Sequence, residues 1–344
     1  MAFGNSILGL GASGVEPPNM QVGYARYTGD GNATQSITSG IGFQPDFTWI
    51  KADNGTDSHV IQDIHTVGSS YISTSSVNGS TASTSNVISY DPEGFTVGSN
   101  LNQSGVAYQA MAIRASNVIE PNTGGNSTTQ VTACEGFSVV RYTGTPGWHQ
   151  IGHGMGVTPN MVLIKNLTAA AQWNMFINDN GTMYRIPLDE TSAGIGGVGA
   201  LGYWNADNFQ LVGNSDAQWD RTGDEYVAYC FAENPNACAV RYYTPVQYNS
   251  GGNCFTPGHD PFFQLFRRID AGAKYAMFHR SRINTGYYLE AQGNGIYNGG
   301  ASTLSTFNSF GTYRFCQSSG YNVDIYSAWP GARYFQLSLG KPIP

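Results

Sequence analysis

The sequence predicts an all-β protein made of tandem jelly-roll-like β-sandwiches behind an extended N-terminal arm. The main observation is an internal repeat, in which residues 42–51 (GFQPDFTWIK) return as residues 156–165 (GVTPNMVLIK). Short apolar runs bounded by turn residues, and a composition low in charge, point the same way. A repeating unit of about one hundred residues has the size of a domain rather than of a solenoid repeat.

The repeat extends on both sides at an offset of 114 to 115 residues. Residues 26–29 match residues 141–144, and residues 90–98 match residues 204–213. A third, more divergent copy is expected in the remainder, because residues 332–337 resemble the segments that end the first two copies. The expected organisation is an arm at 1–20, a first sandwich at 21–118, a linker at 119–134, a second sandwich at 135–235 and a divergent third sandwich at 236–344.

Short apolar runs predict the strands of each sandwich. Runs such as 47–50, 161–164 and 209–212 are rich in β-branched and aromatic residues and are bounded by Gly, Pro, Asn or Asp. No apolar pattern with helical spacing persists for three turns, so helices are not expected. Many short strands with dense turn signals indicate two-sheet sandwiches. The side chains expected in their cores include Trp49, Phe95, Leu163 and Phe209.

Two segments fall outside the repeats. Residues 119–134 begin with a glycine-rich, apolar-poor stretch and are therefore predicted to be a linker. Residues 1–20 lack the basic start of a secretory signal, and glycines interrupt their apolar stretch. Because isolated apolar side chains are poorly solvated, we expect this segment to anchor the protein by ordering against a partner. The expected anchoring residues are Phe3, Ile7, Leu8 and Leu10.

Composition narrows the class of partner. Charged residues make up 11% of the chain, against roughly 25% in an average soluble protein. The net charge of −7 and the absence of a Lys/Arg run give nothing to neutralise phosphates, so nucleic acid is not an expected partner. No window approaches the roughly 18 uninterrupted apolar residues of a membrane-spanning helix.

Five cysteines occur without a CxxC motif and leave one unpaired in any disulfide scheme. A disulfide scaffold is therefore not indicated, and buried thiols are expected. Cys254 and Cys316 both fall in the third copy and are able to face each other, but the sequence does not fix their separation.

The pattern of residues 42–51, followed by Asp57-Ser58-His59, residues 91–98 and residues 106–108, resembles a known family. It is similar to the concanavalin A-like β-sandwich repeats in structural proteins of tailed bacteriophages. The resemblance covers residues 21–118 well and residues 135–235 more loosely. It implies a particle component, such as a fibre, tail or capsid-surface protein, assembled in the host cytoplasm. It brings no catalytic set with it.

Catalysis is tested directly because related sandwiches house glycoside hydrolases, which need two carboxylates about 5 to 9.5 Å apart. Apart from Glu93, which has Asp91 two residues before it, no glutamate here has a second acid two or four residues away, and the adjacent Asp224 and Glu225 would point to opposite faces of a strand. No phosphate loop, Ser-His-Asp order or nucleophilic cysteine context is found. The sequence therefore predicts a protein that is not an enzyme, and a glycan-degrading enzyme is the less favoured alternative.

Metal sites are also weakly indicated. His149 and His153 have a spacing that would bring two ligands together on a helix, but the surrounding glycines predict a loop. Residues 53–57 and 178–181 are rich in oxygen ligands for Ca²⁺, yet both lack a spaced bidentate glutamate and are better explained as Asx-stabilised turns. No metal or cofactor is expected.

Two functions compete for such a particle protein. It is predicted to be a tail or fibre adhesin that binds host-surface glycan, and the alternative is a capsid decoration, cement or joining protein. An adhesin is typically threefold, so a homo-trimer or higher assembly with other virion proteins is expected. Aromatic residues near turns favour glycan stacking but serve protein interfaces equally well. The candidate glycan contacts are Trp148, Trp173, Trp219, Tyr287 and Tyr288.

Overall fold

The computed structural model describes residues 19–53, 57–179, 182–188, 195–196, 201–212, 218–243, 253–255, 258–269, 276–279, 287–290, 296–298, 315–317 and 333–343. These residues form antiparallel strands, short connections and one turn of 3₁₀-helix, η1 (Ser99–Leu101), with no α-helix among them. The protein is therefore all-β, as the sequence predicts. The anchoring arm and its four apolar residues lie outside the described residues.

Sandwich 1 (residues 20–115) pairs a four-stranded sheet with a three-stranded sheet. The larger sheet has the order β1 (Gln21–Thr28), β9 (Ala107–Arg114), β3 (Phe47–Ala52), β4 (Val60–Asp63). The smaller sheet has the order β2 (Thr34–Ile37), β8 (Gly94–Gly98), β7 (Val87–Asp91), and a hairpin is formed by β5 (Ser70–Tyr71) and β6 (Thr81–Ala82).

Sandwich 2 (residues 119–234) repeats this plan with additional strands. Its larger sheet has the order β10 (Glu120–Asn122), β11 (Thr129–Cys134), β12 (Phe137–Thr143), β20 (Glu225–Phe231), β14 (Met161–Asn166), β15 (Asn174–Asp179), β16 (Thr182–Pro187), β17 (Ile195–Gly196). Its smaller sheet has the order β13 (Trp148–Gly152), β19 (Asn208–Val212), β18 (Leu201–Trp204).

Unit 3 (residues 237–343) contains a six-stranded and a two-stranded sheet. The first has the order β21 (Cys238–Tyr243), β28 (Tyr334–Lys341), β23 (Asp260–Arg268), β24 (Ala276–His279), β25 (Tyr287–Glu290), β26 (Ile296–Asn298). The second pairs β22 (Asn253–Phe255) with β27 (Phe315–Gln317) in a register that sets Cys254 opposite Cys316. The thiols of Cys134, Cys230 and Cys238 are free and buried.

All three units share one strand order in their larger sheets. In each of these orders, the first strand of the shared part pairs with the last strand of the unit, which also pairs with the strand at the proline motif. The strand at the proline motif pairs in turn with the strand that comes next along the chain. The resulting orders are β1-β9-β3-β4, β12-β20-β14-β15 and β21-β28-β23-β24. Trp49 lies opposite Met111 in β9, and Leu163 lies opposite Tyr229 in β20. Both side chains are buried, so the predicted equivalence of Trp49 and Leu163 is confirmed.

The larger sheets of sandwiches 1 and 2 are each buried on both faces. Alternate residues of a strand point to opposite faces, and in β3 the side chain of Ile50 enters the core of sandwich 1, whereas Phe47 and Trp49 enter a second, central core. In β14, Ile164 and Leu163 divide in the same way. A sheet buried on both faces explains why these strands read as nearly uninterrupted apolar runs.

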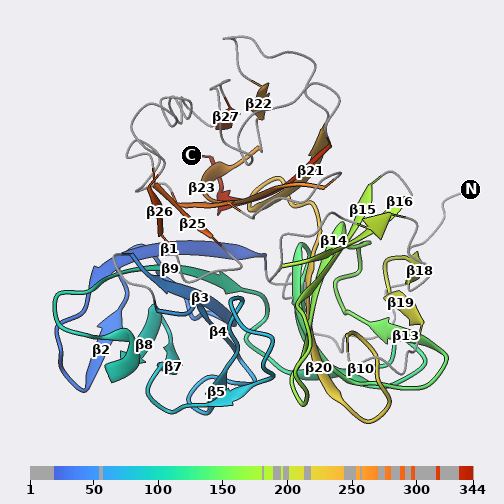
Figure 1. Ribbon diagram of the computed structural model, residues 1–344, viewed down its shortest axis with the longest axis horizontal. Coiled ribbons are helices and arrows are strands. Elements are labelled where there is room, and N and C mark those ends of the chain that lie inside the picture. The colour runs from blue at the N-terminus through green and yellow to red at the C-terminus, as the bar shows by residue number, and fades with distance from the viewer. Residues whose placement is uncertain are drawn as a thin grey trace, which may run out of the picture.

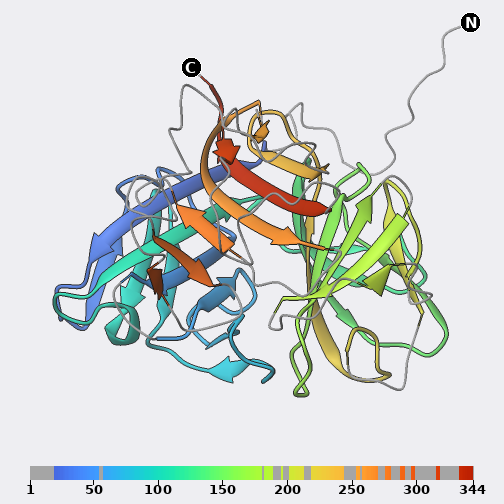
Figure 2. The same ribbon diagram turned by 45° about the horizontal axis from the view of Figure 1, so that its top comes forward.

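The central core is shared by all three units. Its rings include Phe47 of β3, which lies edge-on to Tyr229 of β20 at 4.9 Å between centroids, and Trp49, which lies 5.9 Å from Phe263 of β23. Figure 1 shows sandwich 1 (blue to cyan), sandwich 2 (green to yellow) and unit 3 (orange to red) as three lobes around this point. Figure 2 shows β23 and β28 of unit 3 running across the other two lobes.

The predicted linker is wrong. Residues 120–122 and 129–134 form β10 and β11, which extend the larger sheet of sandwich 2 through the pairing of β11 with β12. Pro121 is compatible with this because β10 is an edge strand, where a missing N–H removes no ladder bond. The glycine-rich stretch is the turn between these two strands.

Candidate functional site

The outer face of the smaller sheet of sandwich 2 carries two exposed aromatic side chains. Along β13, Trp148 is exposed while His149 and Ile151 are buried, as expected of a strand with one face towards a core. Trp148 is 56% exposed and Tyr203, on β18 of the same sheet, is 58% exposed. In the described part of the chain, no other aromatic side chain is exposed to this degree.

Amide side chains lie between these two rings. Gln150 Nε2 donates a hydrogen bond of 2.9 Å to the Tyr203 hydroxyl. Gln150 pairs in register with Gln210 of the central strand β19, and a side chain at Gly202 would collide with that of Gln210. The face therefore combines two exposed rings with planar amides that donate and accept hydrogen bonds. We call Trp148, Gln150, Tyr203 and Gln210 the aromatic face.

Sandwich 1 has no such face at the equivalent positions. The registers of β2 with β8 and of β13 with β19 set Thr34 where Trp148 lies and Ser36 where Gln150 lies. Ser89 precedes the Tyr90–Phe95 pair just as Tyr203 precedes the Trp204–Phe209 pair. The same scaffold therefore folds with small hydroxyl residues at these positions, so the fold does not require the aromatic rings.

Two of the predicted glycan contacts are corrected by their burial. Trp173 is fully buried, its Nε1 donates to the carbonyl oxygen of Ser73 at 2.7 Å, and it belongs to the central core. Trp219 is 7% exposed, donates to the carbonyl oxygen of Val212 at 3.1 Å and packs in the core of sandwich 2. Neither ring is accessible to a surface ligand.

The remaining predicted contacts have different outcomes. Trp148 is exposed on the aromatic face, whereas the side chains of Tyr287 and Tyr288, on β25, lie outside the described residues. Tyr203 was missed by sequence reasoning. The signal that finds it is the comparison of the two repeats, because a small polar residue in one copy and a large ring in the other mark an exposed position that is free to vary.

A Ser-His-Asp arrangement lies behind the aromatic face. Ser127 Oγ is 2.6 Å from His149 Nε2, and His149 Nδ1 is 2.9 Å from Asp220 Oδ1. His149 and Asp220 are fully buried, and Ser127 is half-buried in the turn between β10 and β11. The expectation that His149 lies in a loop is wrong, because it is a strand residue of β13. The three residues come from distant segments, so no sequence spacing reveals them.

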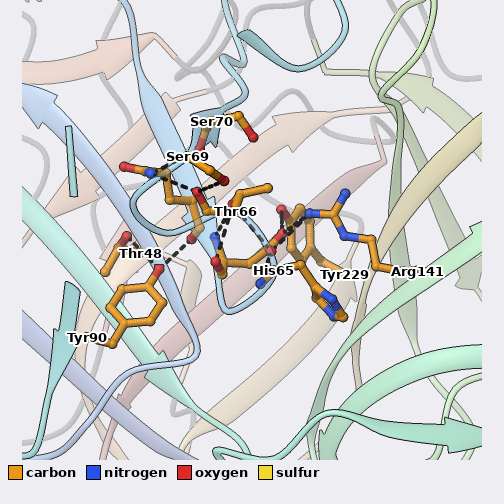
Figure 3. A network of polar contacts seen from close by, with 10 residues as sticks. Thr48, His65, Thr66, Ser69, Ser70, Tyr90, Arg141 and Tyr229 are labelled. Carbon is orange, nitrogen blue, oxygen red and sulfur yellow. Dashed lines mark hydrogen bonds and ion pairs between the residues drawn. The ribbon is translucent and has the colours of Figure 1, made fainter. Parts of the chain in front are cut away.

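A second polar cluster joins sandwich 1 to sandwich 2 and is drawn in Figure 3. The buried carboxylate of Asp63 accepts hydrogen bonds from Arg141 Nη2 at 3.0 Å and from the Tyr229 hydroxyl at 2.7 Å. Burial raises the pKa of Asp63, but the positive charge of Arg141, the charge of His65 and the hydrogen bonds from Tyr229 and Arg141 together outweigh burial and hold the pKa below its usual value. Burial lowers the pKa of the neighbouring His65 to about 4.

Within that cluster, the polar groups form hydrogen bonds mainly with one another. Gln62 donates to the carbonyl oxygen of Ser70 at 2.9 Å and accepts from the Val87 N–H at 2.6 Å, and the Tyr90 hydroxyl donates to the carbonyl oxygen of Gln62 at 2.8 Å. A buried and largely satisfied network of this kind fixes the relative position of two sheets. The Asp63 carboxylate at its centre is fully buried and is therefore not accessible to a ligand.

The described residues form neither a metal-binding cluster nor a membrane-spanning helix. Among the described residues, no three His, Cys, Asp or Glu side chains gather closely enough to hold a metal ion. Asp53, from one of the two oxygen-rich turns, instead accepts hydrogen bonds from Arg26 and Gln109. In the part of the chain that the structure describes, no helix has the length and apolar character needed to cross a bilayer.

Comparison with known proteins gives one match. The model of a family described as a domain of unknown function, DUF7483, matches residues 20–313. No curated protein and no solved structure matches the chain. The family model spans sandwich 1, sandwich 2 and most of unit 3, and therefore includes the aromatic face and the Ser-His-Asp arrangement. Because the match covers most of its length, the chain belongs to the DUF7483 family.

Proposed function

We propose that this protein is a structural component of a tailed-phage particle and that sandwich 2 binds host-surface glycan through the aromatic face. The observation that carries the binding proposal is the pair of exposed rings, Trp148 and Tyr203, on one three-stranded sheet. The resemblance of the repeats to phage sandwich domains supports the particle assignment. We propose a position on the particle surface or tail.

The chemistry of the face suits a sugar chain. Aromatic rings offer broad apolar surfaces against which the C–H faces of sugar rings pack, and they do so at a low cost in side-chain entropy. Gln150 and Gln210 supply amide donors and acceptors for hydroxyl groups. The strand pairing of β13 and β19 holds both amides on a rigid sheet, which limits the ordering cost of binding.

We propose further that the protein does not cleave glycosidic bonds. The aromatic face contains no carboxylate, and glycosidases need a pair of them to protonate the leaving oxygen and to attack or activate water. Incubation with a bound polysaccharide is expected to yield no new reducing ends.

The binding test compares the full chain with a variant that carries Trp148→Thr and Tyr203→Ser. These are the residues that sandwich 1 holds at equivalent positions, so the fold tolerates them. On an array of bacterial surface oligosaccharides, the unmodified protein is expected to bind at least one glycan, and the double variant to lose about tenfold or more in affinity. Val118→Thr is the matched control, because Val118 is 50% exposed outside the aromatic face and its loss is expected to change nothing.

The same variants separate the adhesin from a decoration protein. If the array shows no binding, glycan binding is contradicted, and if the double variant binds as well as the unmodified protein, binding through the aromatic face is contradicted. A double variant that keeps glycan binding but fails to join the particle would instead favour a decoration or joining role, with the rings packed against another virion protein.

The anchoring proposal has its own test. We propose that residues 1–20, through Phe3, Ile7, Leu8 and Leu10, hold the protein on the particle in a few copies, as a trimer or higher assembly. A chain lacking these residues is expected to fold and stay soluble but to be absent from purified particles. Normal incorporation of the shortened chain would contradict the proposal, and the copy number in a particle map distinguishes a tail adhesin from a lattice protein.

A further inference from the structure

We propose that Ser127, His149 and Asp220 form a nucleophilic serine site that cleaves carboxylic esters by acyl transfer. The inference goes beyond glycan binding and does not depend on it. A triad is recognised by geometry and roles rather than by chain order. Here the serine–imidazole distance of 2.6 Å and the imidazole–carboxylate distance of 2.9 Å fall within the range that this chemistry needs.

The hydrogen bonds define the tautomer of His149. Asp220 Oδ1 also accepts from the Thr145 N–H at 3.1 Å, which fixes the carboxylate in place. An ionised carboxylate only accepts hydrogen bonds, so His149 Nδ1 donates to it and Nε2 is left to accept the proton of Ser127. This is the tautomer that a general base requires. Burial raises the pKa of Asp220, and the hydrogen bond with His149 opposes that rise.

The equivalent corner of sandwich 1 shows what the fold alone needs. There, Asn102 Oδ1 accepts from the Asp30 N–H at 2.9 Å, as Asp220 Oδ1 accepts from Thr145. Gln35 holds the position of His149 and donates to the carbonyl oxygen of Thr28 at 3.2 Å. At the positions of His149 and Asp220, sandwich 1 therefore uses the neutral side chains Gln35 and Asn102, and Asn102 Nδ2 also donates to Asp30 Oδ1 at 2.6 Å. The corner of sandwich 1 thus folds without a histidine at the first position or a carboxylate at the second.

The turn between β10 and β11 delivers the serine. Asn126 N–H donates to the carbonyl oxygen of Gln150 at 3.0 Å, and the Gln150 N–H donates to Asn126 Oδ1 at 2.9 Å. Gly125 permits this approach, because a Cβ there would collide with the Gln150 carbonyl. Ser127 is thus held against the edge of β13 by the residue before it, and it is half-buried while its two partners are fully buried.

The reaction is balanced with water as the only co-reactant. Ser127 Oγ attacks the acyl carbon while its proton passes to His149 Nε2, and Asp220 stabilises the imidazolium. The ester C–O bond then breaks, and Nε2 returns the proton to the departing alcohol. Water repeats the sequence on the acyl-serine, which releases a carboxylic acid and restores Ser127. Esters are the substrate class that we propose because an alkoxide is a better leaving group than an amide nitrogen, so an ester needs less activation for the same serine attack.

The test uses the full chain with two small probes, p-nitrophenyl acetate and a fluorophosphonate that labels nucleophilic serines. We expect covalent labelling at Ser127, found by mass spectrometry of the peptide, and release of p-nitrophenol. Ser127→Ala is expected to abolish the label and to lower the release rate by about 100-fold or more. His149→Gln and Asp220→Asn, which install the residues of sandwich 1, are expected to lower labelling while the thermal unfolding midpoint shows that the fold is kept.

Ser36→Ala is the matched control, because Ser36 is an exposed serine on the equivalent sheet of sandwich 1 and is not one of the three proposed site residues. It is expected to leave both readouts unchanged. Absence of label at Ser127, or an unchanged rate in Ser127→Ala, overturns the inference and leaves the three residues as a structural network. Glycan binding is read on the array and ester cleavage by the label at Ser127, so failure of one proposal and failure of the other are seen separately.

Discussion

Sandwich 1 and sandwich 2 are two copies of one scaffold, and they differ mainly where the scaffold does not need a particular residue. The stacked pair Tyr27–Tyr108 recurs as Tyr142–Tyr226, each with ring centroids 5.1 Å apart. The outer faces of the smaller sheets have no such agreement, because sandwich 2 carries rings where sandwich 1 carries hydroxyls. Agreement between the copies therefore marks the fold, and disagreement marks the candidate function.

The largest difference in unfolding free energy between the two sandwiches is expected at a pair of equivalent arginines that have different surroundings. Arg141 is 14% exposed and pairs with the fully buried Asp63 of the other sandwich, whereas its equivalent Arg26 is 54% exposed and pairs with Asp53 of its own sandwich. Arg141→Met leaves a buried charge unpaired and should cost about 3 to 5 kcal/mol of unfolding free energy. Arg26→Met should cost about 1 kcal/mol or less. Urea denaturation measures both, and equal losses would contradict the difference in role.

The next effect concerns equivalent core positions. Trp49→Ala and Leu163→Ala each remove a buried side chain from the central core and should each cost about 2 to 5 kcal/mol. Val118→Ala, at an exposed position, should stay within about 0.5 kcal/mol of the unmodified protein. A small loss at Trp49 or Leu163 in chemical denaturation would show that the central core does not hold the units together.

The residue after the repeated proline should make the stability of sandwich 1 depend on pH in a way that the stability of sandwich 2 does not. Burial raises the pKa of Asp46 to about 6, although the N–H groups of Ala115 and Asn117 oppose the shift, whereas sandwich 2 has the neutral Asn160 there. Because the folded pKa is raised, the stabilising contribution is present below about pH 4 and is lost as the pH rises through about 6. Asp46→Asn should therefore stabilise the protein at pH 7 by on the order of 2 kcal/mol.

At pH 4 the same Asp46→Asn variant should differ little from the unmodified protein, since Asp46 is then protonated in the folded state. Thermal unfolding midpoints measured between pH 4 and pH 7 give the comparison. Parallel curves for the two proteins would mean that Asp46 does not titrate as its burial implies. The reverse change, Asn160→Asp, should introduce a similar loss of stability with rising pH in sandwich 2.

The smallest effect is expected at the aromatic face. Trp148→Thr with Tyr203→Ser replaces exposed rings by the residues of sandwich 1 and should change the unfolding free energy by less than about 0.5 kcal/mol. Calorimetry of the two proteins provides the measurement. A loss of several kcal/mol would show that the rings support the sheet, and the argument that they are free for a ligand would then fail.

The sequence predicts the strands and the core of sandwiches 1 and 2 because the repeat fixes their register. Trp49 is correctly expected to be buried, although only the structure shows that it and its neighbour Ile50 enter different cores. The prediction of a linker at the turn before Ser127 is wrong, since glycines have the same sequence signature whether they give flexibility or allow close approach. The prediction of a surface ring at Trp173 is wrong because its backbone-carbonyl partner is one hundred residues away in the sequence.

The central core also determines where this chain is free to change. In sandwiches 1 and 2, the larger sheet has one face in its own core and the other in the central core, so a substitution there must fit two sets of neighbours. The smaller sheets of these sandwiches and the turns around them escape this double constraint. New binding surfaces can therefore arise there with little risk to folding, and one covalent chain offers two such peripheries that diverge independently, as identical subunits of a symmetric assembly cannot.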